Sequence, residues 1–150
     1  MLYLGSDHAG FQLKEDIKKY LTQEGIAFED LGNAKYEEGD DYVDYGHNVA
    51  KRVAKEEGSK GLVFCGNAEG ICMIANKVKG VRAAIGYNKF AAETSRTDDD
   101  ANVLCLPGRV LTPEYARTIL KLWLETNFSN EPRHQKRLEK MRKLEEEGTI

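Results

Sequence analysis

Residues 61–70 read GLVFCGNAEG: a short apolar run ends in Cys65, and a loop bounded by Gly66 and Gly70 follows it. A continuous apolar run of this length predicts a strand buried on both faces, the kind found in parallel sheets. The residues after Gly70 predict a helix. This strand–loop–helix unit indicates an α/β protein.

The same alternation of short apolar runs and longer amphipathic segments covers the whole chain. Further strands are predicted at 1–7, 26–32, 80–87 and 102–108. Helical spacing of apolar residues predicts helices within 13–21, 43–54, 88–96, 113–123 and 132–147. Five strands separated by helices predict a five-stranded parallel sheet with helices on both faces. No linker or repeat interrupts the pattern, so residues 1–150 are predicted to form a single domain.

Composition and missing motifs exclude several classes of function. The net charge is −3 and the C-terminal basic residues alternate with glutamates, so no nucleic-acid partner is expected. No stretch resembles a signal peptide or approaches the ~20 apolar residues of a membrane span. Three cysteines without a CxxC pair argue against disulfides or structural zinc, and we expect a cytoplasmic protein. Nucleotide motifs and clustered histidines are absent, so no nucleotide cofactor and no metal are predicted.

Ligands of such sheets bind beyond the carboxyl ends of the strands. In this chain the rule selects the segments 6–8, 65–70, 87–88 and 107–109. Cys65 is either a packing residue or, beside helix-start amides that favour negative charge, a reactive thiol. A free thiol is only about 3% ionised at pH 7, so a lowered pKa would make Cys65 a base or nucleophile beside an oxyanion hole. Cys72 and Cys105 are interpreted as packing residues.

Charged side chains are the second set of candidates. Arg133 and Arg137 are four residues apart and share a helix face, where two guanidiniums bind a phosphate or carboxylate well. The alternative is a solvated face that pairs with nearby glutamates. Arg109 at a strand end is either a third cation or a surface salt-bridge partner. Asp7 and His8 close the first strand, and a carboxylate beside an imidazole suits acid–base chemistry.

Five segments together resemble the type B ribose-5-phosphate isomerase family, which includes galactose-6-phosphate isomerase subunits. They are GSDHAGFQLK (5–14), CGNAEGICMIANK (65–77), GVRAAIGYN (80–88), DANVLCLPGRV (100–110) and PRHQKR (132–137). They occur in the family's order and cover nearly the whole chain. The resemblance implies a Rossmann-like three-layer α/β/α sandwich with an extended C-terminal helix. It also implies a homodimer or dimer of dimers, with its sites at the subunit interface.

The resemblance further implies aldose–ketose isomerisation of a sugar phosphate through a cis-enediolate, without metal or cofactor. Cys65 matches the base that moves a proton between C2 and C1. The glutamate that some members use instead corresponds here to Ile71. The loop amides of Gly66, Ala68 and Gly70 would hold the enediolate.

Other substrate contacts are also carried over from the family. The resemblance places Asp7 near the sugar hydroxyls and ring oxygen, and His8 toward the phosphate. Asn102 matches a substrate-contacting asparagine. The residues that match phosphate ligands are Arg109, Arg133 and Arg137, and some of them should come from the partner subunit.

Two family motifs are altered. The loop CGTGxG reads CGNAEG here, so Asn67 replaces a threonine, Ala68 replaces a glycine at a cost if φ is positive, and Glu69 adds a charge at the start of a helix. SRxHNDxN reads SRTDDDAN, with Asp98 in place of the histidine that opens the sugar ring. We therefore interpret Asp98 and Asn67 as catalytic candidates beside Cys65. The alternatives for ring opening are Asp7, His8 and solvent. If the four altered positions lie together, they form one coordinated change.

Three functions are compatible with these residues. The first is isomerisation of ribose 5-phosphate to ribulose 5-phosphate. The second keeps the chemistry but acts on another sugar phosphate, such as allose or galactose 6-phosphate. The third is a sugar-phosphate-binding protein that has lost catalysis.

Overall fold

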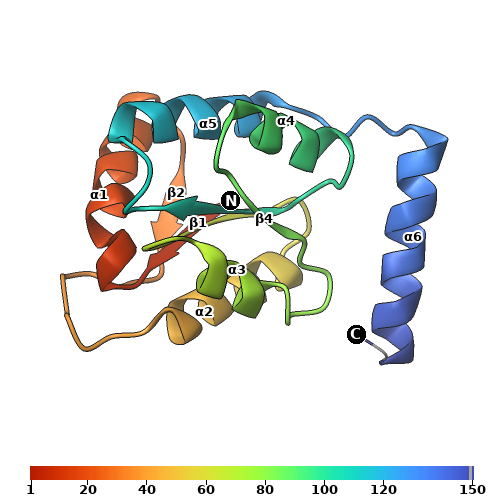
Figure 1. The fold of residues 1–150 in the computed structure, drawn as a ribbon, viewed down its shortest axis with the longest axis horizontal. Coiled ribbons are helices and arrows are strands. Elements are labelled where there is room, and N and C mark those ends of the chain that lie inside the picture. The colour runs from red at the N-terminus through yellow and green to blue at the C-terminus, as the bar shows by residue number, and fades with distance from the viewer. Residues whose placement is uncertain (149) are drawn as a thin grey trace.

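Parallel strands and helices alternate along the chain, of which the computed structural model describes residues 1–148 and 150 (Figure 1). The elements are β1 (Leu2–Ser6), α1 (His8–Gln23), β2 (Phe28–Asp30), α2 (Tyr42–Lys55), β3 (Lys60–Cys65), α3 (Glu69–Ala75), β4 (Ala83–Ile85), α4 (Lys89–Thr97), β5 (Val103–Pro107), α5 (Pro113–Glu125) and α6 (Pro132–Glu147). The strands form one sheet in the order β2-β1-β3-β5-β4, and all pairings are parallel. The predicted five-stranded parallel sheet is confirmed.

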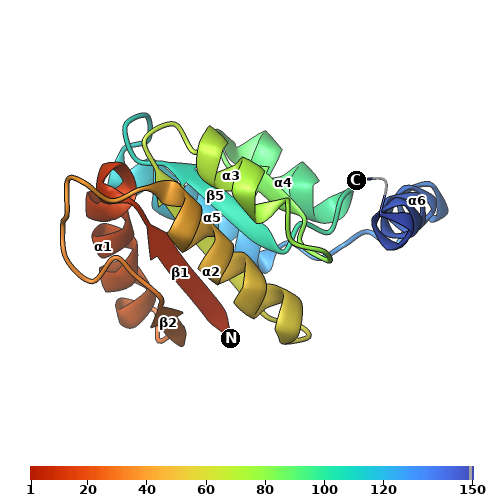
Figure 2. The same ribbon diagram turned by 90° about the horizontal axis from the view of Figure 1, so that it is seen from below.

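Successive side chains of the central strands enter two separate cores. On one face, Leu62 and Phe64 of β3 pack with apolar residues of α1, α4 and α5. On the other, Val63 and Cys65 pack with α2 and α3. Figures 1 and 2 show these helices on the two sides of the sheet. The three-layer sandwich is confirmed, and burial on both faces explains why β1, β3 and β5 read as continuous apolar runs.

Both edge strands are shorter than the apolar pattern predicts. β2 and β4 each have three residues. Residues 80–82, predicted as strand, instead form the loop before β4. The backbone N–H of Arg82 donates to Asn102 Oδ1 at 2.8 Å, and its guanidinium binds the backbone oxygen and carboxylate of Asp100. These bonds hold the loop before β4 against the chain that leads into β5, and Arg82 O also accepts from the backbone N–H of Asn102 at 3.0 Å.

The connection pattern places a point of reversal between β1 and β3. These strands are neighbours, but the helices that follow them, α1 and α3, cover opposite faces of the sheet. Such a point of reversal is where open α/β sheets bind ligands. The backbone N–H of Asp7 donates to Phe64 O at 3.3 Å, which joins the two strand ends at this point.

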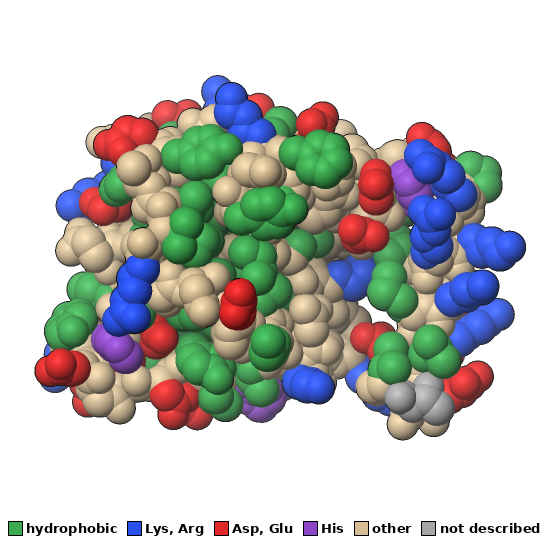
Figure 3. All heavy atoms as spheres, viewed as in Figure 1, with side chains coloured by type: hydrophobic (Ala, Val, Ile, Leu, Met, Phe, Trp, Pro, Cys, Tyr) green, Lys and Arg blue, Asp and Glu red, His purple; other side chains and the backbone are tan. Residues whose placement is uncertain are grey.

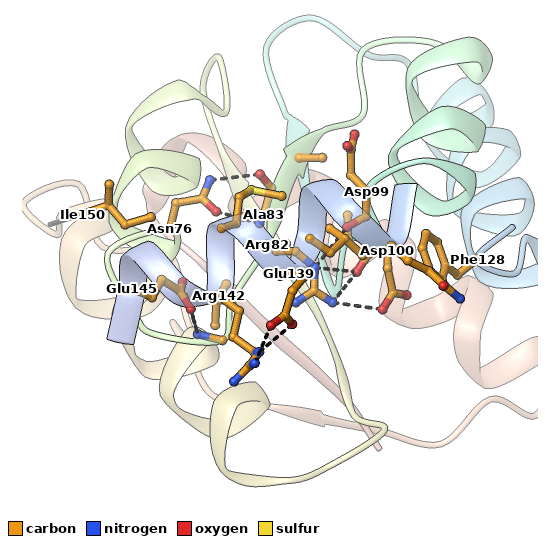
Figure 4. Close-up of a pocket in the computed structure, with 17 residues that line it drawn as sticks. Asn76, Arg82, Ala83, Asp99, Asp100, Phe128, Glu139, Arg142, Glu145 and Ile150 are labelled. Atoms are coloured by element: carbon orange, nitrogen blue, oxygen red, sulfur yellow. Dashed lines mark hydrogen bonds and ion pairs between the residues drawn. The ribbon is translucent and has the colours of Figure 1, made fainter. Parts of the chain in front are cut away.

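Helix α6 stands apart from the sandwich (Figures 1 and 3). His134 is the one buried residue among those described in this helix. The extended C-terminal helix predicted for the chain is confirmed. A cavity of about 660 Å³ lies between α6 and the β4 edge, with Leu138 and Met141 of α6 and Val81 in its lining (Figure 4). Glu145 bridges it by accepting a hydrogen bond from the Gly80 N–H at 3.2 Å.

Candidate active site

The predicted site residues form two clusters at opposite ends of the sheet. The Cys65 cluster lies at the carboxyl ends of β1, β3 and β5; its members are Asp7, His8, Cys65, the loop 66–70 and Arg109. The Arg137 cluster lies where α4 ends and α6 begins; its members are Asp98, Asp99, Arg133, His134 and Arg137. Helix α4 returns the chain from the carboxyl end of β4 to the amino end of β5, so it separates the two clusters.

Cys65 is the last residue of β3 and is 4% exposed. Burial raises the pKa of the Cys65 thiol, and the Asp7 carboxylate raises it further. Backbone N–H groups of Ile71, Ala68 and Asn67 bond to the sulfur and offset part of this rise. The expectation of a lowered pKa is therefore wrong for the single chain, because lost hydration outweighs the helix-start amides. The thiol is protonated at neutral pH.

The loop after Cys65 has the strain that the sequence predicts. Ala68 is buried in the left-handed conformation, with φ of 66°, which costs a residue with a Cβ about 1–2 kcal/mol. Asn67 Oδ1 accepts from the Glu69 N–H at 3.2 Å, and Asn67 Nδ2 donates to the Glu69 carboxylate at 3.3 Å. Glu69 opens α3, as predicted. Ile71 is buried, which leaves Cys65 as the ionisable group at the base of this loop.

Asp7 and His8 stand at the start of α1, beside the loop. Asp7 is the N-cap residue, and its carboxylate accepts from the Gly10 N–H at 3.0 Å. Burial raises the pKa of the Asp7 carboxyl, although this hydrogen bond opposes the rise. His8 Nδ1 lies 2.9 Å from Asp40 Oδ1, and this bond is the largest cause of the raised pKa of His8. The start of α1 thus brings two ionisable groups with shifted pKa values to the sheet edge that carries Cys65.

Arg109 brings a cation to the same loop. Gly108 N–H donates to Cys65 O at 2.8 Å, and Arg109 N–H donates to Gly66 O at 3.0 Å. The Arg109 side chain lies over Gly66, where a Cβ would sit 3.3 Å from Arg109 Cδ. This guanidinium therefore lies beside the loop that follows Cys65, where it suits an anionic ligand.

The Arg137 cluster joins carboxylates to cations. Asp98 ends α4 and lies 3.8 Å from Nε2 of His134, which is 2% exposed. Burial and the Asp98 charge raise the pKa of the neighbouring Asp99, while His134 and Arg137 oppose the rise. Arg133 pairs with Glu131 at 2.7 Å, as the solvated-face alternative predicts. Asp98 does not lie with the altered loop residues 67–69 of the same chain, so the four changes are not contiguous in one subunit.

Asn102 belongs to neither cluster. It precedes β5 at the amino end, and its backbone oxygen binds Gly61, four residues before Cys65 along β3. Its Oδ1 accepts from Arg82 N–H and its Nδ2 donates to Gly80 O, both at 2.8 Å. These bonds fix the loop before β4. The structure thus shows a structural role for Asn102, and the substrate contact that the resemblance implies stays a prediction.

Three residues near these clusters are not among those predicted from the sequence. They are Asp40, Asp99 and His134. Asp40 lies in an irregular acidic loop, 32 residues from His8, so no spacing links the two. Asp99 follows Asp98 in the sequence, and His134 follows Arg133. This position next to a predicted residue is the signal that identifies each of them.

The fold and the candidate site define an α/β protein whose polar and charged site residues lie at the carboxyl ends of parallel strands. The chain belongs to the ribose/galactose isomerase family, whose model matches residues 2–141. Ribose-5-phosphate isomerase B from Mycoplasma genitalium, solved with bound ribulose-5-phosphate, superposes with a TM-score of 0.93 at 38% identity, covering 97% of this chain and 96% of the other.

Two curated relatives extend this likeness. Ribose-5-phosphate isomerase B of Escherichia coli is 37% identical over 95% of this chain and 94% of its own. D-erythrulose-4-phosphate isomerase of Pectobacterium atrosepticum is 34% identical over 83% of this chain and 82% of its own. The family therefore includes members named for different sugar phosphates.

Among residues 1–148 and 150, none of the helices has the length and apolarity to cross a membrane. Within the same residues, no group of three or more His, Cys, Asp or Glu is arranged to hold a metal ion.

Proposed function

We propose that this protein interconverts ribose 5-phosphate and ribulose 5-phosphate through a cis-enediolate, with Cys65 as the base. The observation that carries the proposal is the Cys65 cluster itself. A buried thiol ringed by backbone N–H groups lies between the start of α1 and Arg109, in a chain closely similar to one that holds ribulose-5-phosphate.

In this proposal the Cys65 thiolate removes the proton from C2 of the open-chain aldose. The C2–H electron pair forms the C1–C2 double bond, and the carbonyl electrons move onto O1 to give the enediolate. The loop amides of Gly66, Ala68 and Gly70 hold the oxyanion, and the Asn67 carboxamide supplies a further donor. A proton then passes from O2 to O1. The Cys65 thiol returns its proton to C1, where the C1–C2 double-bond electrons form the new C–H bond, and an electron pair of O2 forms the ketose carbonyl at C2. Asp7 orients the sugar hydroxyls.

We further propose that the working site combines the two clusters across a homodimer or dimer of dimers. One chain supplies the Cys65 cluster. The partner supplies the Arg137 cluster, with Arg133 and Arg137 for the phosphate and Asp98 for ring opening. The first support is the position of the clusters at opposite ends of the sheet. The second is that α6 stands apart from the sandwich, which leaves a partly apolar groove open to a second copy of the chain. Free cysteines fit the reducing cytoplasm as its location.

Incubation of the protein with ribose 5-phosphate in D₂O, followed by proton NMR, tests the activity. We expect ribulose 5-phosphate to appear and the C2 proton of the aldose to exchange with solvent. A protein that binds ribose 5-phosphate but gives neither product nor exchange would be the non-catalytic binder instead. Because a relative is named for a four-carbon substrate, kcat/KM should be compared across tetrose, pentose and hexose phosphates.

Mixing two inactive variants tests the shared site. Cys65→Ala and Arg137→Ala damage different clusters, so after joint unfolding and refolding each mixed dimer holds one intact site. We expect about a quarter of wild-type activity, because random pairing makes about half of the dimers mixed. The control is the double variant Cys65→Ala, Arg137→Ala mixed with wild type, whose mixed dimers contain no intact site. Activity that stays at the level of the separate variants, with mixed dimers present, would show that each chain works alone.

A further inference from the structure

The loop between β2 and α2 places one carboxylate against the start of α1. Asp40 Oδ1 accepts two hydrogen bonds from His8, from its backbone N–H at 2.7 Å and at its Nδ1 at 2.9 Å. The Asp40 side chain is 5% exposed. Its second oxygen accepts from Asn33 Nδ2 at 3.1 Å. Both carboxylate oxygens are therefore occupied, and the carboxylate cannot turn away from the imidazole.

The charges of His8 and Asp40 depend on the groups that surround them. Asp7 and Asp40 face His8 as carboxylates, and both raise the pKa of the imidazole. Tyr36 places its ring at right angles to the imidazole, with the centroids 6.3 Å apart. The hydrogen bonds from Asn33 and His8 lower the pKa of Asp40, although its burial opposes this. Both pKa shifts act in the direction that favours an ionised Asp40 beside a protonated His8.

The backbone amides that open α1 are already occupied. The N–H of Gly10 is bound by Asp7, and that of His8 is bound by Asp40. An anion at this end of α1 therefore has to be met by a side chain. His8 is 28% exposed, and within the described residues its Nε2 has no hydrogen-bond partner. The Nε2–H group of His8 is therefore the donor that an anion at this end of α1 would meet.

We infer that Asp40 is a positioning residue for His8. It holds the imidazole through Nδ1, so that Nε2–H points outward as a charged donor to the phosphate of the substrate. This inference rests on the proposed function for the identity of the ligand, but the pairing of Asp40 with His8 is independent of turnover. The hydrogen bond from a protonated imidazole to a phosphate is charge-assisted, which makes it stronger than a neutral one.

Two substitutions separate charge from position. Asp40→Asn keeps an oxygen that accepts from His8 but removes the charge, whereas Asp40→Ala removes both. Asp41→Asn is the matched control. It removes the same charge from the next residue, whose side chain caps Val43 N–H at 2.8 Å, and asparagine caps as well as aspartate does. The readouts are the His8 titration and tautomer by ¹⁵N NMR, binding of inorganic phosphate, and KM and kcat for ribose 5-phosphate.

We expect the pKa of His8 to fall in Asp40→Asn and to stay at its wild-type value in Asp41→Asn. KM for ribose 5-phosphate should rise about tenfold in Asp40→Asn above the new pKa, the loss of about one charge-assisted hydrogen bond, with kcat within about threefold of wild type. In Asp40→Ala the single tautomer should also be lost.

An unchanged His8 pKa in Asp40→Asn, or an unchanged KM despite a lowered pKa, would overturn the inference. If the protein lacked isomerase activity, the NMR titration and the binding of inorganic phosphate would still decide whether Asp40 controls His8. The inference about Asp40 and the proposed isomerase activity can therefore be refuted independently of each other.

Discussion

Replacing Cys65 by alanine should lower kcat for ribose 5-phosphate by about 10³-fold or more, while the protein remains folded. General-base catalysis contributes about 10²–10⁴-fold, and Ile71, which follows the loop, is buried and carries no base. The lost sulfur leaves a small void in the core face that α2 and α3 cover, so the stability should fall by about 1 kcal/mol. Steady-state kinetics and urea unfolding measure the two effects.

Cys72→Ala is the matched control for this substitution. Cys72 is buried in α3 within the same core, and it has no role in the proposed reaction. Its replacement by alanine removes a buried sulfur atom, as Cys65→Ala does. Its activity should stay within about threefold of wild type, since buried cysteines normally only pack. Comparable losses in both variants would mean that the effect of Cys65→Ala is structural.

The pH dependence of the wild type follows from the raised pKa of Cys65. The base is the thiolate, so activity is present above the pKa of Cys65 and is lost as the pH falls through it. Because burial raises this pKa, kcat/KM should still increase with pH above neutrality. Retention of full activity by Cys65→Ala at any pH would remove Cys65 from the mechanism.

Gly10→Ala should destabilise the protein by about 3 kcal/mol or more, although alanine is the better helix former by about 1 kcal/mol. A Cβ at Gly10 would lie 2.3 Å from the carbonyl carbon of Phe64 and 2.6 Å from the Cys65 nitrogen. Both are backbone atoms at the end of β3, so they cannot rotate aside. Either α1 or the strand end that carries Cys65 has to move, and we expect kcat to fall as well.

Gly39→Ala is the control for this second prediction. Gly39 has open space around it and no positive φ, so the same substitution meets no atoms there. Its urea midpoint should match that of wild type or rise slightly, because alanine restricts the unfolded chain. A Gly10→Ala protein with wild-type stability would mean that α1 does not pack against β3 as closely as the structure shows.

Most of the fold could be read from local patterns. Buried strands such as β3 and β5 show as continuous apolar runs, and helices such as α5 show by their period and by Pro113 at the first position. The apolar pattern predicts a β4 that is too long. It includes Arg82, which instead binds Asn102 and Asp100 across the loop. Edge strands carry weaker patterns since one side of them lacks a partner.

The sequence alone determined the parallel sheet and the position of Cys65 at the carboxyl end of a buried strand. Each depends on residues close in the chain or on a family pattern. The tertiary structure decided what depends on distant residues and on hydration: the hold of Asp40 on His8, the role of Asn102 and the separation of Asp98 from the altered loop. It also reversed the direction of the Cys65 pKa shift. Burial is a property of the packed sandwich, and no local pattern shows how much water a thiol has lost.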